Sequence, residues 1–143
     1  MDRVQYSKNE HAQSVMAAHY GRTPNAFVRS FGCQQSVNDG ERLKGVLQDL
    51  GYTLVAEPAE ADLILFNTCA VREHAEQRVF GNIGALKALK QKDPQLLIGL
   101  CGCMAEEKTT VDKLRESYPY VDMVLGVNAA HLLPDALVEK FTT

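Results

Sequence analysis

The run DLILFN at residues 62–67 constrains the fold of this chain more than any other segment. It has the length of a β-strand, and its apolar residues are consecutive instead of alternating with polar ones. A strand with one solvated face alternates, whereas a parallel strand that helices cover on both faces reads as a continuous apolar run. The segment therefore predicts the centre of a parallel sheet with helices on both sides.

Strand-like and helix-like segments alternate along the chain, which is the pattern of a doubly wound α/β domain. The expected strands are 26–31, 52–55, 62–67, 96–100 and 121–125, and the expected helices are about 37–50, 71–91, 105–118 and 129–141. We expect one parallel sheet in the flavodoxin-like order 2-1-3-4-5, with another Rossmann-like order as the alternative. Gly81 and Gly84 within the second helix each cost about 1 kcal/mol relative to Ala, which close packing against a neighbour would offset.

Residues 1–24 differ in pattern, and we expect them to form an N-terminal helical extension to an α/β domain of residues 25–143. Asn9 is placed to cap a short helix from Glu10 to Tyr20, which Gly21 and Pro24 end. This extension either packs on the domain or is partly mobile.

The charge balance excludes a strongly basic domain that binds nucleic acid by electrostatics alone. Lys and Arg number 15 and Asp and Glu 18, so the net charge is −3. No apolar run approaches the roughly 20 residues that span a bilayer, and the N-terminus lacks the apolar core of a secretory signal. We therefore expect a cytoplasmic protein without a membrane partner, in which four cysteines serve metal binding or redox chemistry rather than disulfides.

Three of the cysteines directly follow predicted strands. Cys33 follows the first strand, Cys69 the third and Cys103 the fourth. The carboxyl ends of parallel strands form one edge of the sheet, and ligands collect there at the point where the strand order reverses. Because these three strands are adjacent in the expected order, the three thiols are expected to meet at that edge.

Three converging thiolates suit either of two metal centres. A 4Fe–4S cluster normally takes four cysteine thiolates, so three would leave one iron open to a small sulfur species or a substrate. Zinc is the alternative, although its structural sites are usually closed by a fourth protein ligand. Cys101 lies at the end of the fourth strand, and we interpret it as a buried structural residue or an accidental thiol near the site.

The residues beside the three cysteines suit a ligand site. Gly32 and Gly102 allow close approaches of the backbone, and Asn67 and Thr68 can orient the following loop through hydrogen bonds. Arg72 opens the next helix, where it can offset the negative charge of a cluster or contact an RNA phosphate. The alternative for Arg72 is a solvated ion pair at the start of a helix.

Three separated motifs resemble the N-terminal domain of the radical-SAM methylthiotransferases. They are FGCQQ at 31–35, NTCAVREHAEQRVFGNIG at 67–84 and GCMAEE at 102–107, in the order found in that family. The middle motif is most similar to the branch that converts isopentenyladenosine beside the tRNA anticodon to its methylthio form. The resemblance extends from about Asn25 to the C-terminus.

The resemblance implies that Cys33, Cys69 and Cys103 ligate the auxiliary 4Fe–4S cluster of the family, which supplies or relays sulfur through its open iron. It also implies that Gln34 and Arg72 lie beside the cluster or face RNA. The implied partners are tRNA, mainly through other domains of the family, and the radical-SAM domain of the same protein.

The chain also departs from the family pattern. Ser36 and Gly40 stand where the family usually has Asn and Ser. The radical-generating C-x-x-x-C-x-x-C motif does not occur in this sequence, and neither does the C-terminal RNA-binding barrel. We therefore expect a fragment or a shortened homologue that does not turn over alone. S-adenosylmethionine and a second 4Fe–4S cluster are expected only with a radical-SAM domain.

Two other interpretations stay open at this point. A flavodoxin-like binding module would hold a flavin phosphate or another anion at the same edge, although the first loop lacks the hydroxyl-rich or glycine-rich cradle that a phosphate needs. A zinc-stabilised structural domain would use all four cysteines.

Overall fold

The computed structural model describes residues 13–15, 17–31, 34–68 and 73–142. Five strands form one parallel sheet in the order β2-β1-β3-β4-β5, which confirms the expected α/β class and strand order. The strands are β1 (Asn25–Ser30), β2 (Thr53–Leu54), β3 (Leu63–Thr68), β4 (Leu97–Gly102) and β5 (Met123–Val124). The helices are α2 (Gln34–Asp49), α3 (Glu73–Ala85), α4 (Lys87–Lys92), α5 (Lys108–Ser117) and α6 (Ala129–Thr142), with 3-10 turns at Pro58–Glu60 and Cys103–Glu106.

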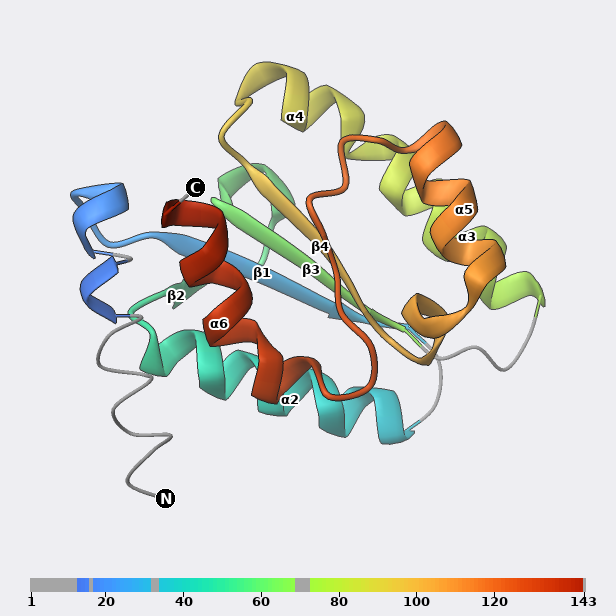
Figure 1. Cartoon of the computed structure of the whole chain (residues 1–143), viewed down its shortest axis with the longest axis horizontal. Helices are drawn as coiled ribbons and strands as arrows, with labels where there is room; N and C mark the ends of the chain where they lie inside the picture. Colours follow the sequence, from blue (N-terminus) through green and yellow to red (C-terminus); the bar gives the residue numbers. More distant parts are fainter. Residues whose placement is uncertain (1–12, 16, 32–33, 69–72, 143) are drawn as a thin grey trace.

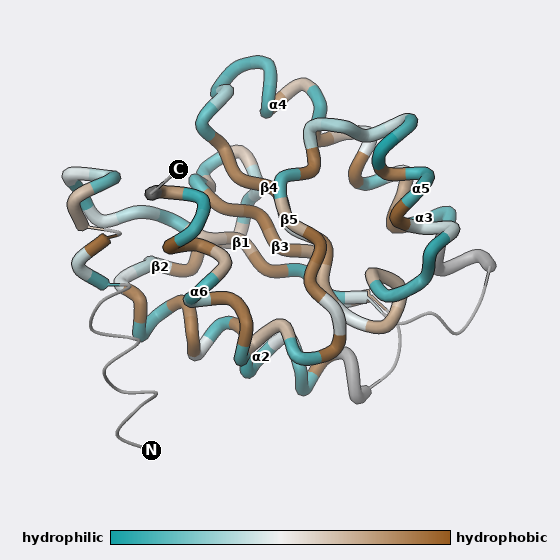
Figure 2. Tube along the Cα trace, in the orientation of Figure 1, coloured by the Kyte–Doolittle hydropathy of each residue, from teal (hydrophilic) through white to brown (hydrophobic). Residues whose placement is uncertain are grey.

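Helices cover both faces of the sheet (Figure 1). α2 and α6 pack together on one face, whereas α3 and α5 cover the other. Apolar residues concentrate along the strands and on the sides of the helices that face them (Figure 2). No helix within the described ranges combines the length and apolar character that crossing a membrane requires.

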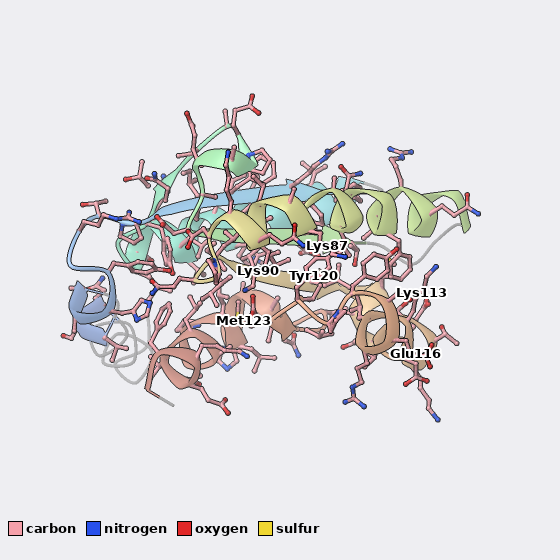
Figure 3. The ribbon with its side chains drawn as sticks, turned by 90° about the horizontal axis from the view of Figure 1, so that it is seen from above. Lys87, Lys90, Lys113, Glu116, Tyr120 and Met123 are labelled. Atoms are coloured by element: carbon pink, nitrogen blue, oxygen red, sulfur yellow. The ribbon has the colours of Figure 1, made fainter. Side chains whose placement is uncertain are left out.

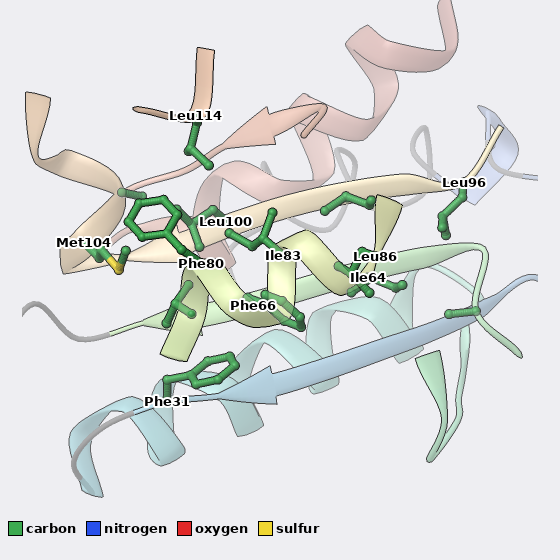
Figure 4. Close-up of a cluster of buried hydrophobic side chains, with 14 residues drawn as sticks. Phe31, Ile64, Phe66, Phe80, Ile83, Leu86, Leu96, Leu100, Met104 and Leu114 are labelled. Atoms are coloured by element: carbon green, nitrogen blue, oxygen red, sulfur yellow. The ribbon is translucent and has the colours of Figure 1, made fainter. Parts of the chain in front are cut away.

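β3 is the central strand, and all six of its residues are buried. Successive side chains of a strand point to opposite faces of the sheet. Leu63 and Leu65 therefore join the core under α2 and α6, while Ile64 and Phe66 join the core under α3 and α5 (Figure 4). Burial on both faces explains the uninterrupted apolar run, as the sequence pattern predicts.

The prediction of a single helix at 71–91 is wrong, because the helix is interrupted at Leu86, between α3 and α4. The Leu86 N–H donates to the Ile83 carbonyl at 3.0 Å, which is the tighter hydrogen bonding of a 3-10 turn. The helix expected at 105–118 also differs. A 3-10 turn comes first, and the extended backbone of Glu107 separates it from α5.

Close packing at the two glycines of α3 is not found among the residues that the structure describes. A Cβ added at Gly81 would meet no atom within 4 Å. One added at Gly84 would meet Tyr118 Cε1 at an ordinary 3.8 Å. The expectation that a close neighbour compensates these glycines is therefore wrong.

We expect Gly81→Ala to raise the free energy of unfolding by about 0.5–1 kcal/mol, because alanine loses less backbone entropy in a helix. Urea denaturation followed by circular dichroism measures this change. Gly99→Ala is the matched substitution that should destabilise, since its Cβ would lie 2.7 Å from Leu65 Cδ2. A lowered midpoint for Gly81→Ala would show that a neighbour does occupy this space.

The described part of the N-terminal segment packs on the α/β domain. Residues 13–15 and 17–20 are helical. His19 stacks on Phe141 of α6 with ring centroids 4.0 Å apart, and the Tyr20 hydroxyl lies 3.0 Å from the Tyr52 hydroxyl. The sequence pattern allows an extension that packs on the domain or one that is partly mobile, and these contacts favour packing.

Candidate functional site

The carboxyl ends of β1, β3 and β4 are hydrogen-bonded neighbours at one edge of the sheet. In the parallel register Ser30 pairs with Asn67, and Asn67 pairs with Cys101. The Phe31 N–H donates to the Asn67 carbonyl at 2.8 Å, so the bonding continues past the end of β1. The strands that precede the three predicted cysteine ligands therefore end side by side, as the sequence pattern predicts.

Thr68 and Gly102 lie opposite each other at the ends of β3 and β4. Thr68 is buried, and its hydroxyl donates to the Cys101 carbonyl at 2.6 Å. Asn67 is also buried at this edge, with 3% of its surface exposed. Thr68 thus holds the ends of β3 and β4 together. Its expected role in orienting the following loop stays a prediction, because residues 69–72 lie outside the described residues.

Gly102 adopts a backbone conformation that is nearly exclusive to glycine, with φ 95° and ψ −169°. Its N–H donates to the Gly126 carbonyl at 3.2 Å. A Cβ at this position would lie 2.1 Å from the Thr68 carbonyl oxygen. Glycine is therefore required both by conformation and by the close approach of β3, and the chain turns directly into the 3-10 turn that Cys103 begins.

The two cysteines of the CGC sequence lie in different environments. Cys101 is fully buried in the core under α2 and α6, and burial raises the pKa of its thiol to about 12. Metals bind the thiolate, so a thiol that burial keeps neutral is a poor ligand. Cys103 is exposed. The burial agrees with the interpretation of Cys101 as a structural residue, and Cys103 is the accessible thiol of the pair.

Part of the predicted site lies outside the described residues. This part comprises Gly32, Cys33, Cys69 and Arg72, together with the side chain of Gln34. Among the residues that are described, no three His, Cys, Asp or Glu side chains lie close enough to hold a metal ion. The convergence of three cysteines therefore stays a prediction.

A cavity of about 210 Å³ lies beside the same edge, between α2 and α6. Asn67 lines it together with Asp39 and Arg42 of α2, and with Asn128 and His131 at the start of α6. Apart from Asn67, the sequence pattern does not mark these residues, and the only signal is that Asn128 and His131 lie at the start of α6. A guanidinium, an imidazole and amides at a helix N-terminus can together bind a polar or anionic group.

Comparison with known proteins identifies the family of the chain. Residues 25–126 match the family described as "Uncharacterized protein family UPF0004". The chain is 46% identical over 123 residues to the tRNA-2-methylthio-N(6)-dimethylallyladenosine synthase of Caldicellulosiruptor saccharolyticus, covering 86% of the chain and 26% of that relative. It is 42% identical over 138 residues to the synthase of the same name from Staphylococcus haemolyticus, covering 96% of the chain and 27% of that relative.

The chain thus spans about a quarter of the length of these curated relatives. The family match begins at the first residue of β1 and ends just after β5, so it includes every strand of the sheet and the edge formed by β1, β3 and β4. The chain belongs to the UPF0004 family, and its resemblance to the N-terminal domain of the tRNA-modifying methylthiotransferases is confirmed.

Proposed function

We propose that this chain is the auxiliary-cluster domain of a tRNA methylthiotransferase that acts on isopentenyladenosine beside the anticodon. The observation that carries the proposal is the pairing of strand ends at the carboxyl edge. The strands that end shortly before Cys33, Cys69 and Cys103 are adjacent and hydrogen-bonded to one another. The three segments that carry these cysteines therefore leave the sheet at neighbouring points.

The described part of this edge suits a 4Fe–4S cluster. Cys103 is exposed and carries a sulfur donor, which is the ligand type that such clusters take. The amino ends of α2 and α6 lie at this edge (Figure 1), and helix dipoles there favour the negative charge of a thiolate-bound cluster. When bound, the cluster would supply or relay sulfur through its one iron that has no protein ligand.

The names of the relatives support the substrate and the partners in this proposal. They are synthases named for a methylthio-dimethylallyladenosine in tRNA, so we propose tRNA as the substrate. Four cysteines cannot supply a radical-generating motif in addition to three auxiliary ligands. S-adenosylmethionine, a second 4Fe–4S cluster and the radical chemistry are therefore assigned to a radical-SAM partner domain, without which this chain is inactive.

Anaerobic reconstitution with iron and sulfide tests the proposal. We expect a brown protein that binds about four irons per chain, the content of one cubane cluster. Cys103→Ala should abolish iron binding, and so should Cys33→Ala and Cys69→Ala. Cys101→Ala is the matched control and should keep the iron, because its thiol is buried in the core. Visible absorption and metal analysis give the readout, and circular dichroism checks the fold of each variant.

Three results would contradict the proposal. Loss of iron in Cys101→Ala, with the fold intact, would show that the ligand set is wrong. A colourless chain that binds zinc would favour the structural zinc domain, and a chain that binds flavin instead of iron would favour the flavodoxin-like module.

A further inference from the structure

The helical segment of residues 77–92 is rich in positive charge although the whole chain has a net charge of −3. Residues 77–92 contain Arg78, Lys87, Lys90 and Lys92 but no acidic residue. Lys90 is neutralised by Asp122, with its Nζ 2.8 Å from Oδ2. The other three cations are exposed, and within the described residues none of them forms an ion pair.

The exposed side of α3 and α4 carries little bulk between these cations. Gly81, Gly84, Ala85 and Ala88 are all exposed there. Figure 3 shows the two helices nearly in line along the outside of the sheet, with Lys87 at their junction. Because the side chains between the cations are small, a partner can approach the helix closely along its length.

Arg29 extends the positive surface from the neighbouring strand β1. Its Nη1 donates to Asn82 Oδ1 of α3 at 3.0 Å, and its guanidinium lies over the Phe31 ring at 4.9 Å. The side chain is exposed, so these contacts hold the cation in place without removing it from solvent. A cation that is already positioned loses less side-chain entropy when it binds a phosphate.

We propose that Arg29, Arg78 and Lys92, here called the α3–α4 surface, bind the phosphate backbone of the tRNA substrate. This inference rests on the proposed function for the identity of the RNA. Neutralising phosphates with Lys and Arg releases counterions and supplies most of the sequence-independent affinity for nucleic acid. Arg78 of α3 and Lys92 of α4 lie on two helices that are nearly in line, which gives a separation of roughly 20 Å, long enough for several phosphates.

The position of this surface suits the proposed reaction. α3 is the helix that follows β3, so it leads away from the carboxyl edge where the cluster is proposed. An RNA that lies along α3 and α4 has one end at that edge. A base near this end can then reach the sulfur donor while the backbone is held at a distance from it.

Binding of a labelled tRNA transcript to the 143-residue chain, followed by fluorescence anisotropy at several salt concentrations, tests the inference. The double variant Arg78→Gln/Lys92→Gln should weaken binding about tenfold at ~0.1 M salt. It should also reduce the slope of log K against log salt by about 1.4–1.8, since each lost phosphate contact removes about 0.7–0.9. The control Lys44→Gln/Lys140→Gln removes the same charge from α2 and α6, and it should leave affinity and slope nearly unchanged.

Equal weakening by both double variants would overturn the inference, because it would reflect net charge alone. Failure of the unmodified chain to bind RNA would also overturn it. Full RNA affinity in Arg78→Gln/Lys92→Gln, with loss of binding to a radical-SAM domain, would assign the surface to a protein partner instead. Iron content measured on the same samples separates the two proposals. RNA binding through this surface by a chain that takes up no iron would support this inference and contradict the proposed function.

Discussion

Replacement of Gly102 by alanine is expected to lower the free energy of unfolding by about 4 kcal/mol. The residue has φ 95° and ψ −169°, and forcing a side chain into this region costs about 1–3 kcal/mol. The added Cβ would also lie 2.1 Å from the Thr68 carbonyl oxygen, a backbone atom that moves only if β3 moves. Overpacking of this kind costs about another 1–3 kcal/mol.

Gly51→Ala separates the two contributions to this loss. Gly51 also has a positive φ, 103°, but a Cβ at Gly51 would meet no atom within 4 Å. Only the conformational cost of about 1–2 kcal/mol is expected there. Urea denaturation of both variants measures the difference, and equal losses would show that the overlap with Thr68 contributes nothing.

Thiol labelling gives a second measurement if Gly102→Ala does not unfold in one clean transition. In the unmodified chain the buried Cys101 should react much more slowly than the exposed Cys103. In Gly102→Ala we expect Cys101 to become reactive, because the end of β4 separates from β3. Mass mapping of labelled peptides identifies each cysteine, and a Cys101 that stays protected in the variant would contradict the expected loosening.

The sheet is predictable from the sequence because the pattern of apolar residues in a strand reflects which of its faces are buried. β3 reads as an apolar run since both of its faces are buried, and adjacent strands follow from the alternation with helices. The break at Leu86 is different. The apolar spacing continues through it, and no Gly or Pro adjoins Leu86 to mark it. Leu86 is buried in the same core as Ile83 and Leu96, and this tertiary environment is not visible in the local sequence.

The candidate site is only partly predictable, for a related reason. Asn67, Thr68 and Gly102 follow from the rule that parallel strands end at one edge. The cavity between α2 and α6 does not follow from that rule. Its Arg42 and His131 come from helices far apart in the sequence, and only the packing of those helices brings them together.

At the opposite, amino edge of the sheet, Asp62→Asn is expected to lower the free energy of unfolding by about 2 kcal/mol at neutral pH. The Asp62 side chain is only 12% exposed. Its Oδ2 accepts hydrogen bonds from Arg22 Nη1 at 3.0 Å and from the Asn25 N–H at 2.7 Å, and Arg22 Nη2 donates to its other oxygen. An amide presents one acceptor oxygen and no charge, so it weakens the link between the N-terminal segment and the start of β1.

The loss should depend on pH in a defined direction. Burial opposes the charged form of Asp62, but the hydrogen bonds from Arg22 and Asn25 and the charge of Arg22 outweigh it and hold the pKa of this carboxyl below its ordinary value. The unfolded chain therefore takes up the proton first as the pH falls. The stabilisation is full above the ordinary Asp pKa of about 3.9, and it is lost as the pH falls through the lower pKa of the folded state.

Urea midpoints of the unmodified chain and Asp62→Asn, compared across pH, measure this dependence. We expect the gap between them to be widest near pH 7 and to begin to narrow near pH 4, where the unfolded chain starts to take up the proton. It should close only below the lowered pKa of the folded state, where the carboxylate is protonated in both states. Asp112→Asn is the control, because Asp112 is an exposed residue of α5 and its substitution should open no gap. A gap for Asp62→Asn that keeps its full size at acidic pH would show that side-chain shape, rather than the charge of the carboxylate, links these segments.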